Sequence, residues 1–193
     1  FNVNVATFAL GNGHICYLVG QQARCWGVGV LGQLGSNSLT SSSTPVTVAG
    51  GHNFTQLVAG LAFTCGLRTD GRAFCWGAGA AGQRGDGMAG NLASPSAVLG
   101  NHTFMQITAG EQHACGITAA GAAWCWGLGL HGQLGNGGSS NSATPVPVSG
   151  GHTWASIVGG GVHTCGITTT GAALCWGSNS GRQLGRGQSG SSS

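Results

Sequence analysis

The sequence repeats itself with a period of fifty residues, and this period constrains the fold more than any other feature. Three strings superimpose without a gap, namely TCGLRTDGRAFCWG, ACGITAAGAAWCWG and TCGITTTGAALCWG, and an earlier, shorter copy is ICYLVGQQARCWG. Each copy continues into GQLG, GQRG or RQLG, and Pro45, Pro95 and Pro145 share one phase. A fixed period of this length is typical of tandem structural units that pack on their neighbours.

Each copy contains two cysteines, which makes eight in the chain. In the last three copies they are ten residues apart, so a three-residue hairpin loop such as Thr69-Asp70-Gly71 places Cys65 opposite Cys75. In the first copy the spacing is nine, and a two-residue loop, Gly20-Gln21, restores the same register. Metal sites usually have closer pairs such as Cys-x2-Cys, which do not occur here. We therefore predict the disulfides Cys16–Cys25, Cys65–Cys75, Cys115–Cys125 and Cys165–Cys175.

The predicted disulfides indicate an oxidising compartment. Each closes a loop of about ten residues, which stabilises the fold by roughly 2–3 kcal/mol in the chain-entropy description. Such stabilisation suits a chain with 40 glycines among 193 residues, because glycine loses much conformational freedom on folding. We expect a secreted, extracellular protein.

The chain contains few charged residues, and this excludes some classes of function. Charged residues make up 5% of the chain, lysine is absent, and the net charge of +3 comes from scattered arginines. Nucleic-acid binding requires clustered basic residues, so we expect no nucleic-acid partner. No apolar run reaches 18 residues, so we expect no membrane span. Because Phe1 begins neither an initiator sequence nor a signal peptide, we interpret the chain as mature or excised.

Two tripeptides match the acceptor pattern for N-linked sugar, beginning at Asn53 and at Asn101. In a secreted chain with few charges, glycans would add solubility, so we expect at least one of them to be occupied. The Ser- and Thr-rich stretch 36–44 is either a carrier of O-linked sugar or a solvated loop.

Each repeat predicts four short strands separated by glycine turns. The first is an apolar run such as 54–58, the next two form the cysteine hairpin, and the fourth includes Pro45–Val48 in the first repeat. The predicted fold is all-β, with four tandem propeller-blade-like repeats in a partial, four-unit or intermolecularly completed propeller or array. The predicted units are 1–49, 50–99, 100–149, an incomplete 150–187, and a flexible Gly/Ser tail at 188–193.

The recurring pattern H-T-C-G-I, C-W-G, G-Q-L-G and a later proline resembles the repeats of the regulator of chromosome condensation family. The cysteine pair in the hairpin is most similar to the extracellular "crinkly" variant. The resemblance covers about residues 5–187. It implies a seven-bladed propeller, of which four repeats are present. The nucleotide-exchange activity of the intracellular founder needs an acidic face, which a chain with three acids, Asp70, Asp86 and Glu111, does not offer.

The strand count is uneven, since fifteen repeat strands are present where four complete blades need sixteen. The N-terminal segment alternates apolar and polar residues, with Phe1, Val3 and Val5 on one side. We predict that it is an assembly strand that supplies the missing strand, within the chain or to a neighbour. A contact with a neighbour would be head to tail and would produce a ring or filament.

Histidine, tryptophan and glutamine recur in phase, and we predict structural roles for them. His14, His113 and His163 share a position that Phe63 occupies in the second repeat, which favours packing over metal binding. His52, His102 and His152 are expected at a blade edge or loop. The tryptophans after the second cysteine are expected to fill the space between blades; they are Trp26, Trp76, Trp126 and Trp176. The turn glutamines are expected to bridge backbone groups of adjacent units; they are Gln33, Gln83, Gln133 and Gln183.

We find no candidate for catalysis, because the three acids are isolated and no cysteine is left over as a nucleophile. No metal or cofactor is predicted. We expect a non-enzymatic, secreted glycoprotein scaffold that contacts another extracellular protein or itself, as in a surface fibre. The alternative is a receptor-like or lectin-like ligand-binding ectodomain, and a third hypothesis, the exchange factor, rests on the resemblance alone. Multimers without added ligand would favour the first hypothesis, and a monomer with saturable ligand binding the second.

Overall fold

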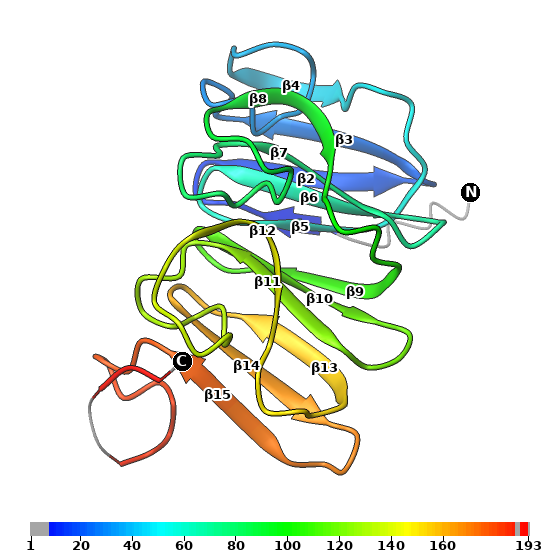
Figure 1. The fold of residues 1–193 in the computed structure, drawn as a ribbon. Coiled ribbons are helices and arrows are strands. Elements are labelled where there is room, and N and C mark those ends of the chain that lie inside the picture. The colour runs from blue at the N-terminus through cyan, green and yellow to red at the C-terminus, as the bar shows by residue number, and fades with distance from the viewer. Residues whose placement is uncertain (1–7, 188–189, 193) are drawn as a thin grey trace.

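The computed structural model describes residues 8–187 and 190–192, and every regular element in these ranges is a strand. The strands form four antiparallel sheets that follow one another along the chain as the blades of an open propeller arc (Figure 1). Blade 1 comprises β1 (Phe8–Leu10), β2 (His14–Val19), β3 (Gln22–Gly27) and β4 (Ser42–Thr47). Blade 2 comprises β5 (Phe54–Ala59), β6 (Phe63–Arg68), β7 (Ala73–Gly77) and β8 (Leu92–Ala97). Blade 3 comprises β9 (Phe104–Ala109), β10 (His113–Thr118), β11 (Ala123–Gly127) and β12 (Ser142–Pro147), and blade 4 comprises β13 (Trp154–Gly159), β14 (His163–Thr168) and β15 (Ala173–Gly177).

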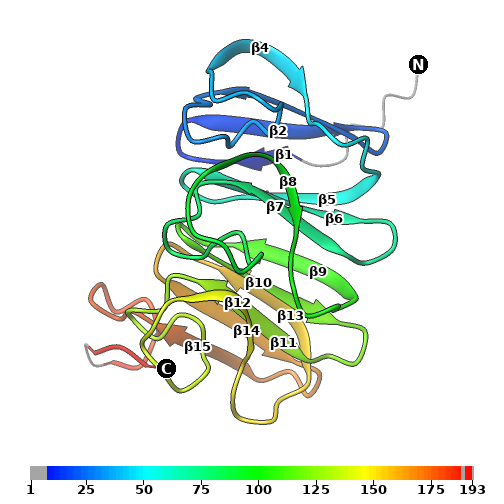
Figure 2. The ribbon, with the colours of Figure 1, turned by 45° about the horizontal axis from the view of Figure 1, so that its top comes forward.

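The all-β fold of four blade-like repeats is confirmed, and so is the count of fifteen strands within the described residues. The sheets do not close into a ring, and blades 1 and 4 lie at opposite ends of the arc (Figure 2). The predicted assembly strand with Phe1, Val3 and Val5 lies outside the described residues. In the part of the chain that the structure describes, we find no helix with the length and apolar character needed to cross a bilayer.

The outer strand of a blade begins earlier than predicted. β4 starts at Ser42 instead of Pro45, because Ser42 pairs with Gly27 before a register shift leads to the pairing of Val46 with Cys25. Part of the Ser/Thr-rich stretch is therefore an edge strand with exposed side chains. Pro45 is compatible with this strand because an edge strand has one unpaired side.

Blade 4 repeats the beginning of this outer pairing. Ser192 and Gly177 exchange two backbone hydrogen bonds of 2.6 and 2.9 Å, although the sequence predicted a flexible tail there. Ser192 corresponds to Ser42 and Ser142, which pair with the equivalent glycines of blades 1 and 3. The fourth strand of blade 4 is thus present as a single pair in the described residues.

The core is divided into three clusters, one between each pair of consecutive blades. The loops that join the first two strands of consecutive blades are also linked, through Asn12 N–H to Leu61 O, Leu61 N–H to Glu111 O, and Glu111 N–H to Gly161 O. Because each blade is stabilised mainly by its neighbours, the two end blades each leave one packing face uncovered.

Candidate interaction surfaces

The hairpins form the predicted disulfides. Cys65 lies opposite Cys75 across a three-residue turn, and Cys16 lies opposite Cys25 across a two-residue turn. Gly71 has φ +78° and Gly20 has φ +61°, conformations that suit glycine because it lacks a Cβ. The structure contains all four bridges, Cys16–Cys25, Cys65–Cys75, Cys115–Cys125 and Cys165–Cys175, and no free cysteine in the described residues.

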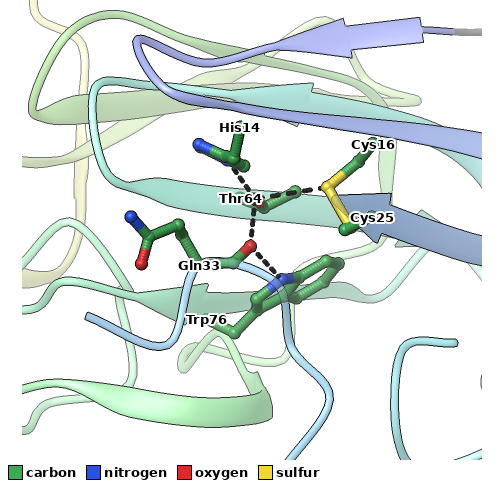
Figure 3. The surroundings of a disulfide bond; sticks show 6 residues. All are labelled: His14, Cys16, Cys25, Gln33, Thr64 and Trp76. Carbon is green, nitrogen blue, oxygen red and sulfur yellow. Dashed lines mark hydrogen bonds between the residues drawn. A yellow bond between two sulfur atoms is a disulfide. The ribbon is translucent and has the colours of Figure 1, made fainter. Parts of the chain in front are cut away.

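A chain of hydrogen bonds crosses from blade 1 to blade 2 beside the first disulfide (Figure 3). His14 Nε2 lies 2.8 Å from Thr64 Oγ1, and Thr64 Oγ1 donates to the main-chain carbonyl of Gln33 at 3.0 Å. Trp76 Nε1 donates to the same carbonyl at 3.0 Å. The Cys16 sulfur lies 3.7 Å from the Thr64 oxygen, so the hydroxyl group also contacts the disulfide.

This geometry determines which ring nitrogen of His14 is protonated. A carbonyl oxygen can only accept, so the single hydroxyl hydrogen of Thr64 points to Gln33. The Thr64 oxygen must then accept from His14, and Nε2 of that ring carries the hydrogen. The buried Nδ1 is unprotonated and has no hydrogen-bond partner among the described residues. Burial accordingly lowers the pKa of His14 to about 4.

The interface between blades 3 and 4 has the same arrangement. His113 Nε2 lies 2.9 Å from Thr164 Oγ1, which donates to the Gln133 carbonyl at 2.9 Å. Trp176 Nε1 donates to that carbonyl at 3.0 Å. Burial, with a smaller contribution from the neighbouring His163, lowers the pKa of His113 to about 4.

The interface between blades 2 and 3 differs at both ends of this hydrogen bond. Phe63 occupies the histidine position and Ala114 the threonine position, and both side chains are buried. Only the indole bond remains, from Trp126 Nε1 to the Gln83 carbonyl at 3.1 Å. The polar histidine–threonine pair of two interfaces is thus replaced at the third by the apolar pair Phe63 and Ala114. Because both members of the pair change together, this supports the predicted structural role of the histidine position.

The blade 2 loop that contains Gln83 also contains a buried ion pair between Arg84 and Asp86. Arg84 replaces the leucine found at this place in the other blades, Leu34, Leu134 and Leu184. Its guanidinium lies 3.0 Å from the Asp86 carboxylate and donates to the Gly90 carbonyl at 3.0 Å. Both side chains are almost completely buried.

The predicted bridging role of the turn glutamines requires a correction. The side chain of Gln33 accepts from Leu31 N–H within its own loop, and only its main-chain carbonyl contacts the next blade. The side chains that bridge blades belong to first-strand glutamines, which the sequence analysis missed. Gln56 donates to the Ile107 carbonyl at 2.8 Å and accepts from Ile107 N–H at 3.0 Å, and Gln106 does the same with Ile157. Their recurrence fifty residues apart was the available signal.

Three of the four recurrent tryptophans fill the space between blades as predicted, and Trp26 does not. Trp76, Trp126 and Trp176 are buried between blades, whereas Trp26 is partly exposed on the free side of blade 1. His52, His102 and His152 precede the first strands and contact aromatic rings, with His102 4.1 Å from the Trp124 ring. No group of three or more metal-binding side chains is found in the described ranges.

Blade 1 leaves an apolar face uncovered. Phe8 stacks on Tyr17 at 5.8 Å between ring centroids, and Tyr17 meets Trp26 edge-on at 5.5 Å. Tyr17 stands where the inner blades have a glycine and forms the aromatic pair that Phe54 forms with Trp76 in blade 2. Phe8 corresponds to the buried Leu57 of blade 2 but is 55% exposed.

Blade 4 leaves uncovered the other face of the sheet, which in blades 1 to 3 packs against the following blade. The Cys165–Cys175 bridge is partly exposed, although the other three bridges are completely buried. Ile167 is 48% exposed, whereas its counterpart Ile117 is buried against blade 4. Beside this face, a groove of about 390 Å³ lies along Leu174 and Cys175, where the outer strand covers the hairpin in the complete blades.

The two acceptor sites for N-linked sugar lie on one edge of the arc. Asn53 and Asn101 are exposed in the loops that precede β5 and β9. The hairpin turn of the preceding blade contacts each such loop, as in the bond from Phe104 N–H to the Gly71 carbonyl at 2.7 Å.

The geometry defines a class of protein, the disulfide-stabilised partial β-propeller. The repeat described as "Regulator of chromosome condensation (RCC1) repeat" matches residues 54–83, 106–133 and 154–183 in one form and 120–167 in another. The chain belongs to the family of RCC1-repeat proteins. No curated protein sequence matches it.

Solved structures show the same fold. Human WBSCR16 is similar with a TM-score of 0.89 and 22% identity over 100% of this chain and 52% of that one. Yeast RCC1 (Prp20), solved bound to Kap60, has a TM-score of 0.85 and 20% identity over 100% and 48%. The CRINKLY ectodomain of the Arabidopsis thaliana receptor kinase ACR4 has a TM-score of 0.57 and 20% identity over 100% and 54%. The chain spans about half the length of these structures.

Proposed function

We propose that this chain is a secreted, non-enzymatic scaffold that contacts another extracellular protein through the free faces of its end blades. The observation that carries the proposal is the contrast between equivalent positions. Phe8 is more than half exposed where Leu57 is buried, and Ile167 is about half exposed where Ile117 is buried. Exposed apolar side chains at positions that are buried between the other blades favour contact with a partner.

Three further features support an extracellular, interacting role. Hairpin disulfides persist in oxidising compartments. The sequon residues Asn53 and Asn101 are exposed, so both are accessible to glycosylation. The acids are separated, with Asp70 paired to Arg68, Asp86 paired to Arg84, and Glu111 on a different loop, which disfavours acid–base chemistry.

Site-specific photo-crosslinking in an extracellular fluid tests this function. A photoreactive phenylalanine analogue placed at Phe8 or at Ile167 should form covalent adducts with one or a few proteins. The matched control is the same analogue at Met105, which is 70% exposed on an inner blade and should form none. Absence of adducts from both end faces, or equal adduct formation at Met105, would contradict the proposal.

Mass spectrometry of the same material tests the secreted state. We expect eight oxidised cysteines and a glycan on Asn53 or Asn101 that endoglycosidase removes. Free thiols together with unmodified asparagines would argue against an extracellular role.

A further inference from the structure

Two asparagines of the chain precede a glycine, Asn12 before Gly13 and Asn136 before Gly137. In such a pair the main-chain nitrogen of the glycine can attack the carbonyl carbon of the asparagine side chain, because glycine has no Cβ that hinders the approach. This reaction is one reason why asparagine is a thermolabile residue. It requires a side-chain amide that rotates freely, and the structure distinguishes the two pairs in this respect.

The Asn12–Gly13 pair is free to react. It lies in the bend between β1 and β2, and both residues are exposed, so water reaches the amide. The Asn12 N–H donates to the Leu61 carbonyl at 3.3 Å. Neither the Asn12 side chain nor the Gly13 N–H forms a hydrogen bond with any of the described residues. The amide and the nitrogen that attacks it are therefore both available.

The Asn136–Gly137 pair is restrained. Asn136 is half-buried, and its Oδ1 accepts from Gly138 N–H at 3.2 Å. Asp86, the equivalent residue of blade 2, accepts from Met88 N–H at 3.2 Å in the same way, so this side-chain orientation recurs in the loop. The hydrogen bond and the partial burial restrict the rotation of the Asn136 amide.

We propose that Asn12 is a deamidation site of this protein and that the fold protects Asn136. The Gly13 nitrogen forms a bond to Asn12 Cγ, the Cγ–Nδ2 bond breaks, and the displaced amide nitrogen leaves as ammonia with the hydrogen that Gly13 loses. The resulting succinimide takes up one water molecule. Opening at Cγ gives aspartate, and opening at the main-chain carbonyl carbon gives isoaspartate, so water is the only other reactant.

The products change the contact between blades 1 and 2. Both add a carboxylate, which lowers the formal net charge of +3 by one. In isoaspartate the main chain runs through Cβ and Cγ of residue 12 and gains a methylene group. This group lies beside the bond from Asn12 N–H to the Leu61 carbonyl, and two residues before His14, whose ring contacts Thr64 of blade 2. We therefore expect isoaspartate to loosen the packing of blade 1 on blade 2.

Peptide mapping of the whole, disulfide-intact chain after incubation in mildly alkaline buffer tests the assignment. Aspartate and isoaspartate should accumulate at position 12 about tenfold faster than at position 136, since the restrained amide must first give up a hydrogen bond. In the reduced and denatured chain the two positions should react at similar rates, because the protection of Asn136 depends on the fold.

Gly13→Ala is the matched variant, because Ala62 stands at the equivalent position of blade 2 and Gly13 lies outside the left-handed region. The added Cβ would meet a methyl group of Val28 at 2.9 Å, and this side chain is exposed and can rotate away. Conversion of Asn12 should slow by about tenfold in this variant, since a side chain hinders the attacking nitrogen. Circular dichroism establishes that the variant is folded.

Hydrogen exchange supplies the second readout. The amide hydrogens of β2 should exchange faster in aged wild-type protein than in fresh protein, and not in aged Gly13→Ala. Equal conversion at positions 12 and 136 of the folded chain, or an undiminished rate in Gly13→Ala, would overturn the assignment. Complete conversion of Asn12 with unchanged exchange in β2 would overturn the predicted effect on the blade contact.

Discussion

The interface between blades 2 and 3 differs in chemistry from the interfaces on either side of it, although equivalent positions of the repeat meet at all three. On either side, a histidine, a threonine and a loop carbonyl form a buried polar chain. In the middle, Phe63 and Ala114 fill the same space without a hydrogen bond, and the adjoining loop carries the Arg84–Asp86 pair in place of an apolar residue. The comparison teaches that the blade contact tolerates either polarity if both partners change together, since an unpaired buried polar group is what costs stability.

Breaking the ion pair at the middle interface should have the largest effect. Asp86→Ala leaves the buried Arg84 guanidinium without its counter-ion, which should lower the free energy of unfolding by about 3–5 kcal/mol. The control, Arg84→Leu with Asp86→Asn, installs the side chains of Leu134 and Asn136 and should be nearly neutral. Denaturant unfolding monitored by tryptophan fluorescence measures both. A double variant as unstable as Asp86→Ala would show that the pair is not an independent unit.

Converting half of the apolar contact to the polar type should cost nearly as much. Phe63→His places an imidazole opposite Ala114 with no acceptor and loses apolar volume, for an expected loss of about 2–4 kcal/mol. Adding Ala114→Thr supplies the acceptor, so the double-mutant cycle should give a favourable coupling energy of about 1–3 kcal/mol. Equal losses in the single and double variants would mean that the two positions do not act together.

Acidification should weaken the two polar interfaces. His14 and His113 have native pKa values lowered to about 4, so below pH 6.5 the unfolded chain binds protons that the native chain does not. The stability is complete above pH 6.5 and falls as the pH drops towards 4, by about 3 kcal/mol for each histidine. Unfolding free energies measured at several pH values test this. His113→Phe with Thr164→Ala should lose the part of the pH dependence that comes from His113, and an unchanged slope would assign it to other groups.

Removing one hydroxyl should have the smallest effect. Thr64→Val keeps the shape of the side chain but deprives His14 Nε2 of its acceptor, with an expected loss of about 1–2 kcal/mol. Thr47→Val, at an exposed position in the outer strand β4, is the control and should change stability by less than about 0.5 kcal/mol. Similar values for the two variants would show that the buried hydrogen bond contributes nothing measurable.

Local spacing was sufficient to predict much of this structure. The distance between paired cysteines and the turn glycines Gly20 and Gly71 specified the hairpin register, because pairing across a short turn depends only on the number of residues between the partners. The replacement of histidine by Phe63 at one repeat predicted packing for that position. The period of fifty residues predicted one blade-like unit for each repeat.

Contacts between repeats could not be predicted in this way. The glutamines Gln33 and Gln56 both recur with the repeat, yet only the side chain of Gln56 reaches the next blade, because the loop folds the Gln33 amide back on Leu31. The pairing of position 14 with position 64, and of 63 with 114, depends on how one sheet lies over the next.

The sequence by itself determined the repeat, the strands and the four disulfides, since these depend on residues within about ten positions of one another. Only the tertiary structure decided which side chains meet across blades, which histidine nitrogen is protonated, and that Ile15 and His163 occupy the two uncovered faces. The physical reason is that packing between sheets brings together residues about fifty positions apart in the sequence. A local sequence pattern contains no information about which of these residues meet.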